Sequence, residues 1–133
     1  MLVAIDGPSG SGKSTVARAL AERLGFTYLD SGAMYRCVGL LSLEEPTRSP
    51  GSLARGARIE LDPGAGGPDA GPRVLLDGRD VTEAIRAPEV SEAASRVAAD
   101  PQVREALVVR QRELIAGGDW VAEGRDIGTV VAP

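Results

Sequence analysis

The sequence predicts an α/β fold in which helices flank a parallel β-sheet. An apolar run at residues 2–5 leads through a glycine-rich loop into an amphipathic segment at 13–24, and a second apolar run follows at 26–29. Strand, helix and strand in this order form a βαβ unit, with parallel strands and a right-handed crossover. A third strand is expected at 120–122. The 133 residues are enough for one domain, which we place at 1–133.

The first strand and first helix follow from simple patterns. Leu2 to Ile5 are all apolar, as is typical of a strand buried on both faces of a parallel sheet. The helix predicted at 13–24 has an apolar face, made of Val16, Ala17, Leu20, Ala21 and Leu24. Gly25 follows directly, where glycine commonly ends a helix in the left-handed conformation.

A second helix is predicted after residues 30–32, at the carboxyl end of the second strand. Asp30 or Ser31 can cap it. Its apolar positions share one face, formed by Met34, Cys37, Val38 and Leu41. Prolines and a glycine between residues 46 and 51 break the helical pattern, and 52–56 fit a further helical turn.

Residues 57–86 are predicted to form a small inserted subdomain with antiparallel strands. Polar and apolar residues alternate at 57–62 and again at 73–77. The segment between them, 64–72, is too rich in glycine and proline for regular structure. The dipeptide at 77–78, Asp-Gly, favours a tight turn.

Two more helices are predicted before the third strand. After Pro88, apolar residues recur at helical spacing, at Val90, Ala93, Ala94, Val97 and Ala98. Asp100 and Pro101 are typical of a helix start, and the apolar face that follows consists of Val103, Ala106, Leu107 and Leu114.

The composition excludes several classes of function. A net charge of −4 argues against a nucleic-acid-binding protein, which usually has a basic surface. With no histidine and one cysteine, the chain cannot form a Ser-His or Cys-His pair or a His/Cys metal cluster. It has no signal peptide and no apolar run that could span a membrane. We therefore expect a cytoplasmic monomer that binds neither nucleic acid nor membranes.

The loop before the first helix matches G-x-x-x-x-G-K-[ST], the phosphate-binding loop. The ATP-binding stretch is Gly7, Pro8, Ser9, Gly10, Ser11, Gly12, Lys13, Ser14 and Thr15. The glycines let backbone N–H groups converge on an anion, and the helix N-terminus adds its dipole. Lys13 is expected to reach the β and γ phosphates, and the Ser14 hydroxyl to bind Mg²⁺.

A glycine- and serine-rich loop that carries a lysine by chance is the alternative. Two observations favour triphosphate binding. The motif lies between a predicted strand and a predicted helix, as its mechanism requires. In addition, Lys13 is the only lysine among 15 basic residues. The expected fold is therefore of the P-loop NTPase type.

Three strand ends are expected to meet at one edge of the sheet, where open α/β folds bind ligands. They bring the phosphate loop, residues 30–32 and residues 124–126. Phosphoryl transfer to a hydroxyl usually needs a base, whereas the phosphate of a nucleoside monophosphate is already largely ionised at neutral pH. The many arginines and the lack of histidine favour the second acceptor. Glu123 either holds Mg²⁺ through water or is a solvated carboxylate.

Four blocks of the sequence resemble the bacterial cytidylate kinases. They lie at 5–13, at 29–36, at 93–95 together with 103–107, and at 124–131, and the turn at 77–82 resembles that family's inserted CMP-binding subdomain. The second and fourth blocks are more specific than the phosphate loop. The resemblance spans essentially the whole chain. It implies a P-loop kinase that uses ATP with Mg²⁺ to convert CMP or dCMP to the diphosphate.

The resemblance also implies residue roles. Ser31 contacts the CMP sugar, and Arg36 and Arg125 bind its phosphate and act with Lys13 in catalysis. This implication replaces the simpler alternatives for two residues, which are a helix cap for Ser31 and a solvated arginine for Arg36.

For the base, the resemblance implies Ser95, Arg104 and Asp126 at the cytosine edge. Cytosine offers an amino donor and two acceptors, which a carboxylate, an arginine and a hydroxyl complement. Uracil presents an acceptor where cytosine presents its amino group, so Asp126 disfavours uracil.

Members of that family continue beyond the Thr-Val-Val stretch with another core strand, an arginine-rich lid over ATP and further CMP-binding residues. This chain stops at Pro133. We therefore expect a truncated form of a longer kinase, which binds nucleotide weakly and without turnover.

Two other functions fit part of the pattern. One is a small-metabolite kinase in which Asp30 or Asp126 orients a hydroxyl, although the inserted hairpin and the arginines argue against it. The other is a nucleotide-binding module without turnover, or a GTPase-like switch. Guanine recognition commonly uses Asn-Lys-x-Asp, and the chain contains no asparagine.

Overall fold

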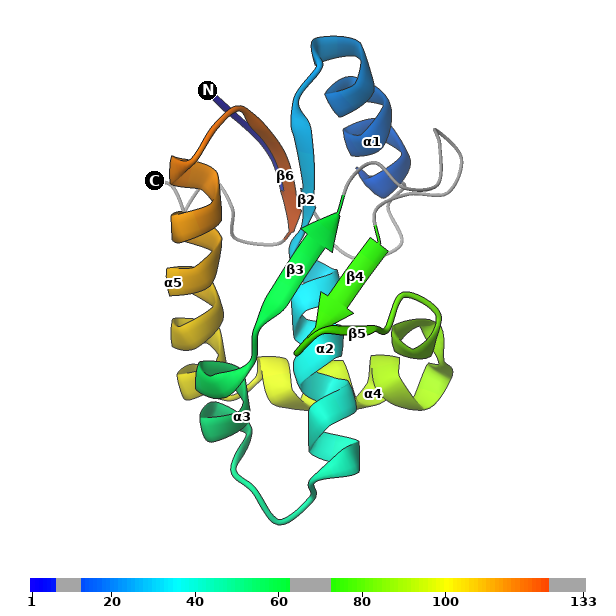
Figure 1. Cartoon of the computed structure of the whole chain (residues 1–133), viewed down its shortest axis with the longest axis vertical. Coiled ribbons are helices and arrows are strands. Elements are labelled where there is room, and N and C mark those ends of the chain that lie inside the picture. The colour runs from blue at the N-terminus through cyan, green and yellow to red at the C-terminus, as the bar shows by residue number, and fades with distance from the viewer. Residues whose placement is uncertain (7–12, 63–72, 125–133) are drawn as a thin grey trace. The chain divides into compact units, whose positions relative to one another are not determined.

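The computed structural model describes residues 1–6, 13–62 and 73–124 (Figure 1). The chain divides into two compact units. The first consists of Met1–Gly32 and Val108–Pro133, and the second of Ala33–Leu107. Helix α2, Ser31–Glu44, begins in the first unit and continues in the second, and α5, Pro101–Ala116, runs from the second into the first.

The first unit contains a parallel three-stranded sheet, which confirms the predicted sheet type. Its strands are β1 (Leu2–Asp6), β2 (Thr27–Asp30) and β6 (Trp120–Gly124), in the order β1-β6-β2. Helix α1, Lys13–Leu24, packs beside the sheet, as Figure 1 shows. The strand that comes last in the described sequence therefore lies between the two that come first.

The register of the sheet fixes which side chains face α1. Val3 pairs with Val121, which pairs with Tyr28 on its other side. These three residues form a row, and all belong to the apolar cluster that includes Ala17 and Ala21 of α1. Because side chains alternate along a strand, the row two positions further also faces α1. That next row consists of Ile5, Glu123 and Asp30.

Two expectations about burial are wrong. Ala4 of β1 is exposed, because β1 pairs on only one side among the described strands. On α1, Val16 and Leu24 are 60% and 45% exposed, because only a narrow strip around Ala17 and Ala21 touches the sheet. The apolar face predicted for this helix is wider than the surface that buries it.

Helix α1 ends as its glycine predicts. Gly25 has a φ of +68°, and its N–H donates to the Glu22 carbonyl at 3.3 Å. The Phe26 N–H donates to the Ala21 carbonyl at 2.9 Å, which completes a Schellman motif. Phe26 then packs against the same cluster as Leu20, so the motif turns the chain into β2.

The second unit contains the antiparallel sheet. Its strands are β3 (Ile59–Asp62), β4 (Arg73–Leu76) and β5 (Arg79–Asp80), in that order. Asp77 and Gly78 have φ values of +51° and +83°, which a two-residue type I′ hairpin turn requires. The predicted 57–62 strand begins two residues later than expected, and the loop expected at 64–72 lies outside the described residues.

The remaining helices of this unit are α3 (Pro50–Gly56), the short 3₁₀ helix η1 (Ala84–Arg86) and α4 (Pro88–Ala98). Helix α3 begins earlier than the predicted 52–56, because Pro50 occupies its first turn and the Ser49 hydroxyl accepts from the Ser52 N–H at 3.3 Å. Gly39 of α2 lies against the α4 backbone at Ala93 and Ala94.

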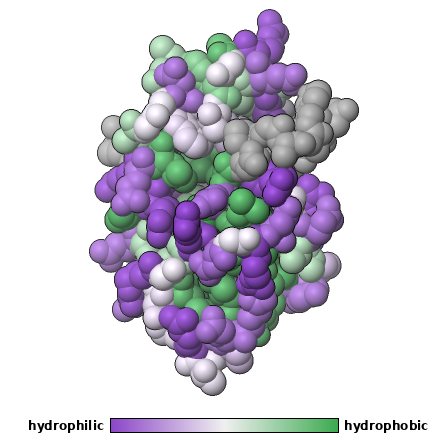
Figure 2. Space-filling model, viewed as in Figure 1, coloured by the Kyte–Doolittle hydropathy of each residue, from purple (hydrophilic) through white to green (hydrophobic). Residues whose placement is uncertain are grey.

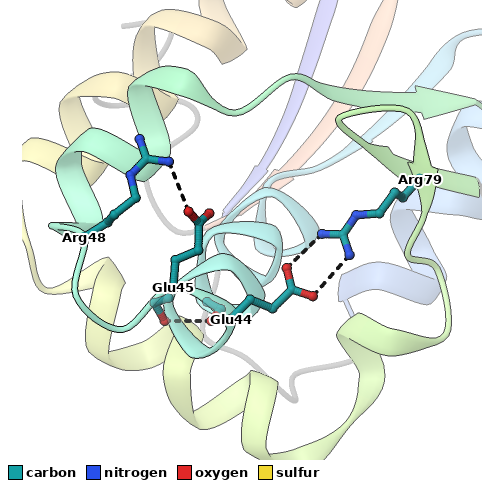
Figure 3. Close-up of polar contacts among 6 residues, drawn as sticks. Glu44, Glu45, Arg48 and Arg79 are labelled. Carbon is teal, nitrogen blue, oxygen red and sulfur yellow. Dashed lines mark hydrogen bonds and ion pairs between the residues drawn. The ribbon is translucent and has the colours of Figure 1, made fainter.

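An ion pair joins the end of α2 to the antiparallel sheet. Arg79 donates to both carboxylate oxygens of Glu44, at 2.8 and 3.1 Å (Figure 3). Arg48 donates to the neighbouring Glu45 at 3.3 Å. Both pairs are solvent-exposed, and Figure 2 shows hydrophilic residues over much of the face in view. They lie on the surface of the unit, above its buried apolar residues.

Candidate functional site

The carboxyl ends of the three parallel strands meet at one edge, as the sequence predicts. Asp6, the last residue of β1, pairs with Gly124, and Asp30, the last residue of β2, pairs with Glu123. Beyond these residues, β1 leads to the phosphate-loop motif, β2 leads directly into α2, and β6 leads to residues 125–129. This edge is the candidate site, since ligands bind there in open α/β sheets.

Glu123 is a buried carboxylate at this edge. Only 3% of its surface is exposed, so the interpretation of a solvated carboxylate is wrong. Its Oε1 accepts a hydrogen bond of 2.9 Å from the hydroxyl of Tyr28, which is itself buried. The donor lies 95 residues away in the sequence, on the neighbouring strand. A buried carboxylate needs such donors, because burial without them is costly.

Ser31 connects α2 to the same strand. It is buried, and its hydroxyl donates to the main-chain carbonyl of Glu123 at 2.9 Å. The first residue of α2 is thereby tied to the end of β6. A hydroxyl that donates one bond can still accept others, so this contact is compatible with a ligand nearby.

Several predicted site residues have side chains that lie outside the described part of the structure. Residues 7–12 of the phosphate loop, Arg125 and Asp126 lie outside the described ranges. Lys13 and Ser14 form the start of α1, although only their backbone is described. Thr15 follows in the first turn and is exposed. The last two residues of the phosphate-loop motif are therefore also the first two residues of α1.

The other predicted residues belong to the second unit. Arg36 is half-buried on α2, Ser95 is exposed on α4, and Arg104 is exposed on α5. The Ser95 hydroxyl donates to the Ser91 carbonyl at 3.3 Å, one helical turn earlier. Because Gly39 brings α2 against α4, Arg36 and Ser95 stand on helices whose backbones touch.

The single thiol of the chain is not a nucleophile in this fold. Burial raises the pKa of Cys37 to about 12, and this outweighs the opposite effect of the neighbouring Arg36 charge. The thiolate is the reactive form, so the folded chain keeps this group inert at neutral pH. Cys37 is a core residue of α2.

Two carboxylates at this edge carry oxygen atoms, the kind of donor that Mg²⁺ prefers to nitrogen or sulfur. Glu123 and Asp30 are neighbours in one row, and both supply carboxylate oxygens. Among the described residues, no group of three or more histidine, cysteine or acidic side chains could enclose a metal. Mg²⁺ does not need such a cage, because it is usually held by one or two carboxylates together with water and substrate phosphates.

The helices give no sign of a membrane span. Within the described part of the chain, none of them is both long and apolar enough to cross a bilayer.

Comparison with known proteins gives one consistent family. The family model described as cytidylate kinase matches residues 3–133. A cytidylate kinase of Carboxydothermus hydrogenoformans is 53% identical over 138 residues, covering 100% of this chain and 60% of that protein. One of Solibacter usitatus is 51% identical over 138 residues, covering 100% of this chain and 56% of that protein.

Part of a bifunctional protein is also similar in sequence to this chain. The bifunctional pantoate ligase/cytidylate kinase of Prochlorococcus marinus is 50% identical over 137 residues, covering 99% of this chain and 28% of that protein. Against the first two relatives, the chain spans 56 to 60% of the relative's length.

Proposed function

The chain belongs to the cytidylate kinase family, and from this premise we propose that it is the nucleotide-binding part of an ATP-dependent (d)CMP kinase. The reaction transfers the γ-phosphoryl group of ATP to CMP or dCMP and yields CDP or dCDP. The observation that carries the proposal is the common edge where β1, β2 and β6 end. Each of these strands directly precedes one of three family motifs, and the ends of the three strands are neighbours in the sheet.

On the ATP side, we propose that the loop from Gly7 to Thr15 binds the phosphates, with Lys13 as the main cation. Ser14 binds Mg²⁺ directly and Glu123 holds it through water. When bound, Mg²⁺ neutralises charge on the phosphates during transfer. The buried, hydrogen-bonded carboxylate of Glu123 supports this role.

On the CMP side, we propose that Arg36 and Arg125 bind the phosphate, Ser31 the sugar, and Ser95, Arg104 and Asp126 the base. The obstacle to transfer is repulsion between two polyanions. Guanidinium forks match phosphate oxygens and offset that repulsion without a general base. Residues 57–86 are proposed as the monophosphate-binding subdomain, and their antiparallel strands support a separate folded segment.

We propose a monomeric, cytoplasmic protein. Light scattering during size-exclusion chromatography measures the molar mass of the chain in solution and so tests whether it is a monomer.

The test of function uses the chain extended with a family-like C-terminus. Five acceptors, CMP, dCMP, UMP, AMP and shikimate, are each incubated with ATP and Mg²⁺. Among these acceptors we expect only CMP and dCMP to be phosphorylated, each to its diphosphate, and Lys13→Ala should abolish the transfer. Arg23→Ala is the matched control, because it removes a positive charge from the far end of α1 and should leave turnover unchanged. Transfer to another acceptor in place of CMP refutes the proposal, as does nucleotide binding by the extended chain without any transfer. The 133 residues alone are expected to bind nucleotide weakly and without turnover.

A further inference from the structure

We propose that Tyr28 is a positioning residue: its hydroxyl holds the Glu123 carboxylate in the orientation that binds the hydrated Mg²⁺ of ATP. The inference rests on the proposed function and extends it to a residue outside the motifs. The contact that suggests it is the 2.9 Å hydrogen bond from the Tyr28 hydroxyl to Glu123 Oε1, in which both side chains are buried.

The register of the sheet explains why this tyrosine reaches that carboxylate. Tyr28 is level with Val121, whereas Glu123 is level with Asp30. The two side chains thus share the face covered by α1 but lie two positions apart along the strands. Two positions along a strand amount to about 7 Å. The long tyrosine side chain covers this distance and places its hydroxyl at the Glu123 carboxylate.

The tyrosine ring is held in place by its surroundings. It packs in the apolar cluster with Ala17 and Ala21 of α1, and only 6% of its surface is exposed. The Arg18 guanidinium lies 6.0 Å from the ring centroid, over the ring. A ring with so little freedom gives its hydroxyl a fixed position, whereas glutamate has three flexible bonds of its own.

Glu123 is therefore anchored at two points. Ser31 donates to its main-chain carbonyl, and Tyr28 donates to its side chain. Its row faces α1 at the edge where β1 leaves the sheet for the phosphate loop. A carboxylate has about four acceptor positions, so the bond to Tyr28 is compatible with a water of the metal ion. Partners that orient a metal-site carboxylate typically change metal affinity by about 10–100-fold.

The test is Tyr28→Phe, which keeps the ring and its packing and removes only the hydroxyl. ATP affinity is measured by calorimetry with Mg²⁺ and with EDTA. We expect the gain in affinity from Mg²⁺ to fall by about 10-fold, with the affinity in EDTA unchanged. Glu123→Gln should lose the same gain, and the double variant should lose no more than either single variant. Tyr35→Phe, at the chain's other tyrosine, is the matched control and should keep the full gain.

The possible results separate the two proposals. If ATP binding by the unmodified chain gains nothing from Mg²⁺, the metal site of the proposed function fails. If that gain is present and Tyr28→Phe keeps it, the positioning role is overturned. An equal loss of affinity with Mg²⁺ and with EDTA also overturns it, because that pattern indicates a structural role.

A second measurement covers the case in which Tyr28→Phe does not fold. The unmodified chain is labelled with ¹³C at the tyrosine ζ position, and Mg²⁺ is added to its ATP complex. We expect the Tyr28 resonance to shift as Glu123 engages the hydrated ion. A resonance that does not move contradicts the proposal.

Discussion

Replacing Gly39 by alanine is predicted to destabilise the second unit by forcing α2 away from α4. A Cβ at Gly39 would lie 2.7 Å from the Ala94 nitrogen, 3.0 Å from its Cα and 3.1 Å from the Ala93 carbonyl carbon. All three obstacles are backbone atoms, so no side-chain rotation relieves them. Overpacking of this kind costs about 1–3 kcal/mol, and the better helix propensity of alanine returns up to about 1 kcal/mol.

Because backbone atoms cannot rotate aside, the overpacking cost is expected near the upper end of that range, about 3 kcal/mol. The expected net loss for Gly39→Ala is therefore about 2 kcal/mol of unfolding free energy. It is measured by urea unfolding followed by circular dichroism, with the midpoint moving at constant slope. Gly56→Ala is the control with open space, since its Cβ meets nothing within 4 Å. If Gly39→Ala is as stable as the unmodified chain, the close helix approach is refuted.

Three further changes test other features of the fold. Gly25→Ala should cost about 1 kcal/mol, because φ is +68° although the space around it is open; a urea midpoint equal to that of the unmodified chain would contradict this. The hydrogen bonds from Arg79 lower the pKa of Glu44 below its ordinary 4.5, so the stabilisation from this pair is present above that pH and lost as the pH falls through the lowered value. The difference in unfolding free energy between the unmodified chain and Glu44→Gln should thus be at most about 1 kcal/mol at neutral pH and should shrink in acid and in high salt. A difference that does not change with pH or salt argues against a stabilising ion pair. Cys37 should resist a thiol reagent at pH 9.0, its ordinary pKa, until urea unfolds the chain, and rapid labelling of the folded chain would exclude the burial described here.

Local patterns predicted the elements well, because each depends on neighbouring residues. The bounds of α1 at 13–24 and the glycine that ends it follow from spacing and from a single φ requirement. The position of β6 between β1 and β2 was not predicted, since an apolar run does not specify which strands lie beside it. The exposure of Val16 and Leu24 was missed for a related reason: the width of the surface that covers a helix is a tertiary property.

Some features of the candidate site could likewise be predicted from the sequence, and others could not. The motif at 7–14 and the meeting of strand ends could be read from the sequence, because the chemistry of phosphate binding restricts both residue type and order. The hydrogen bond between Tyr28 and Glu123 could not, since it depends on the register of strands 95 residues apart. One signal was available: Tyr28 lies two positions before Asp30 and so shares its face of the strand.

The central place of β6 has a consequence for how the chain acquires its structure. During synthesis β1 and β2 are made early, yet each pairs with β6, at 120–124, in the described sheet. The second unit, Ala33–Leu107, is made in between and can fold first as a continuous stretch. Its folding shortens the loop that must close before β6 is inserted, which lowers the entropic cost of that step. Until then β1 and β2 expose unpaired edges, which are open to pairing with other chains.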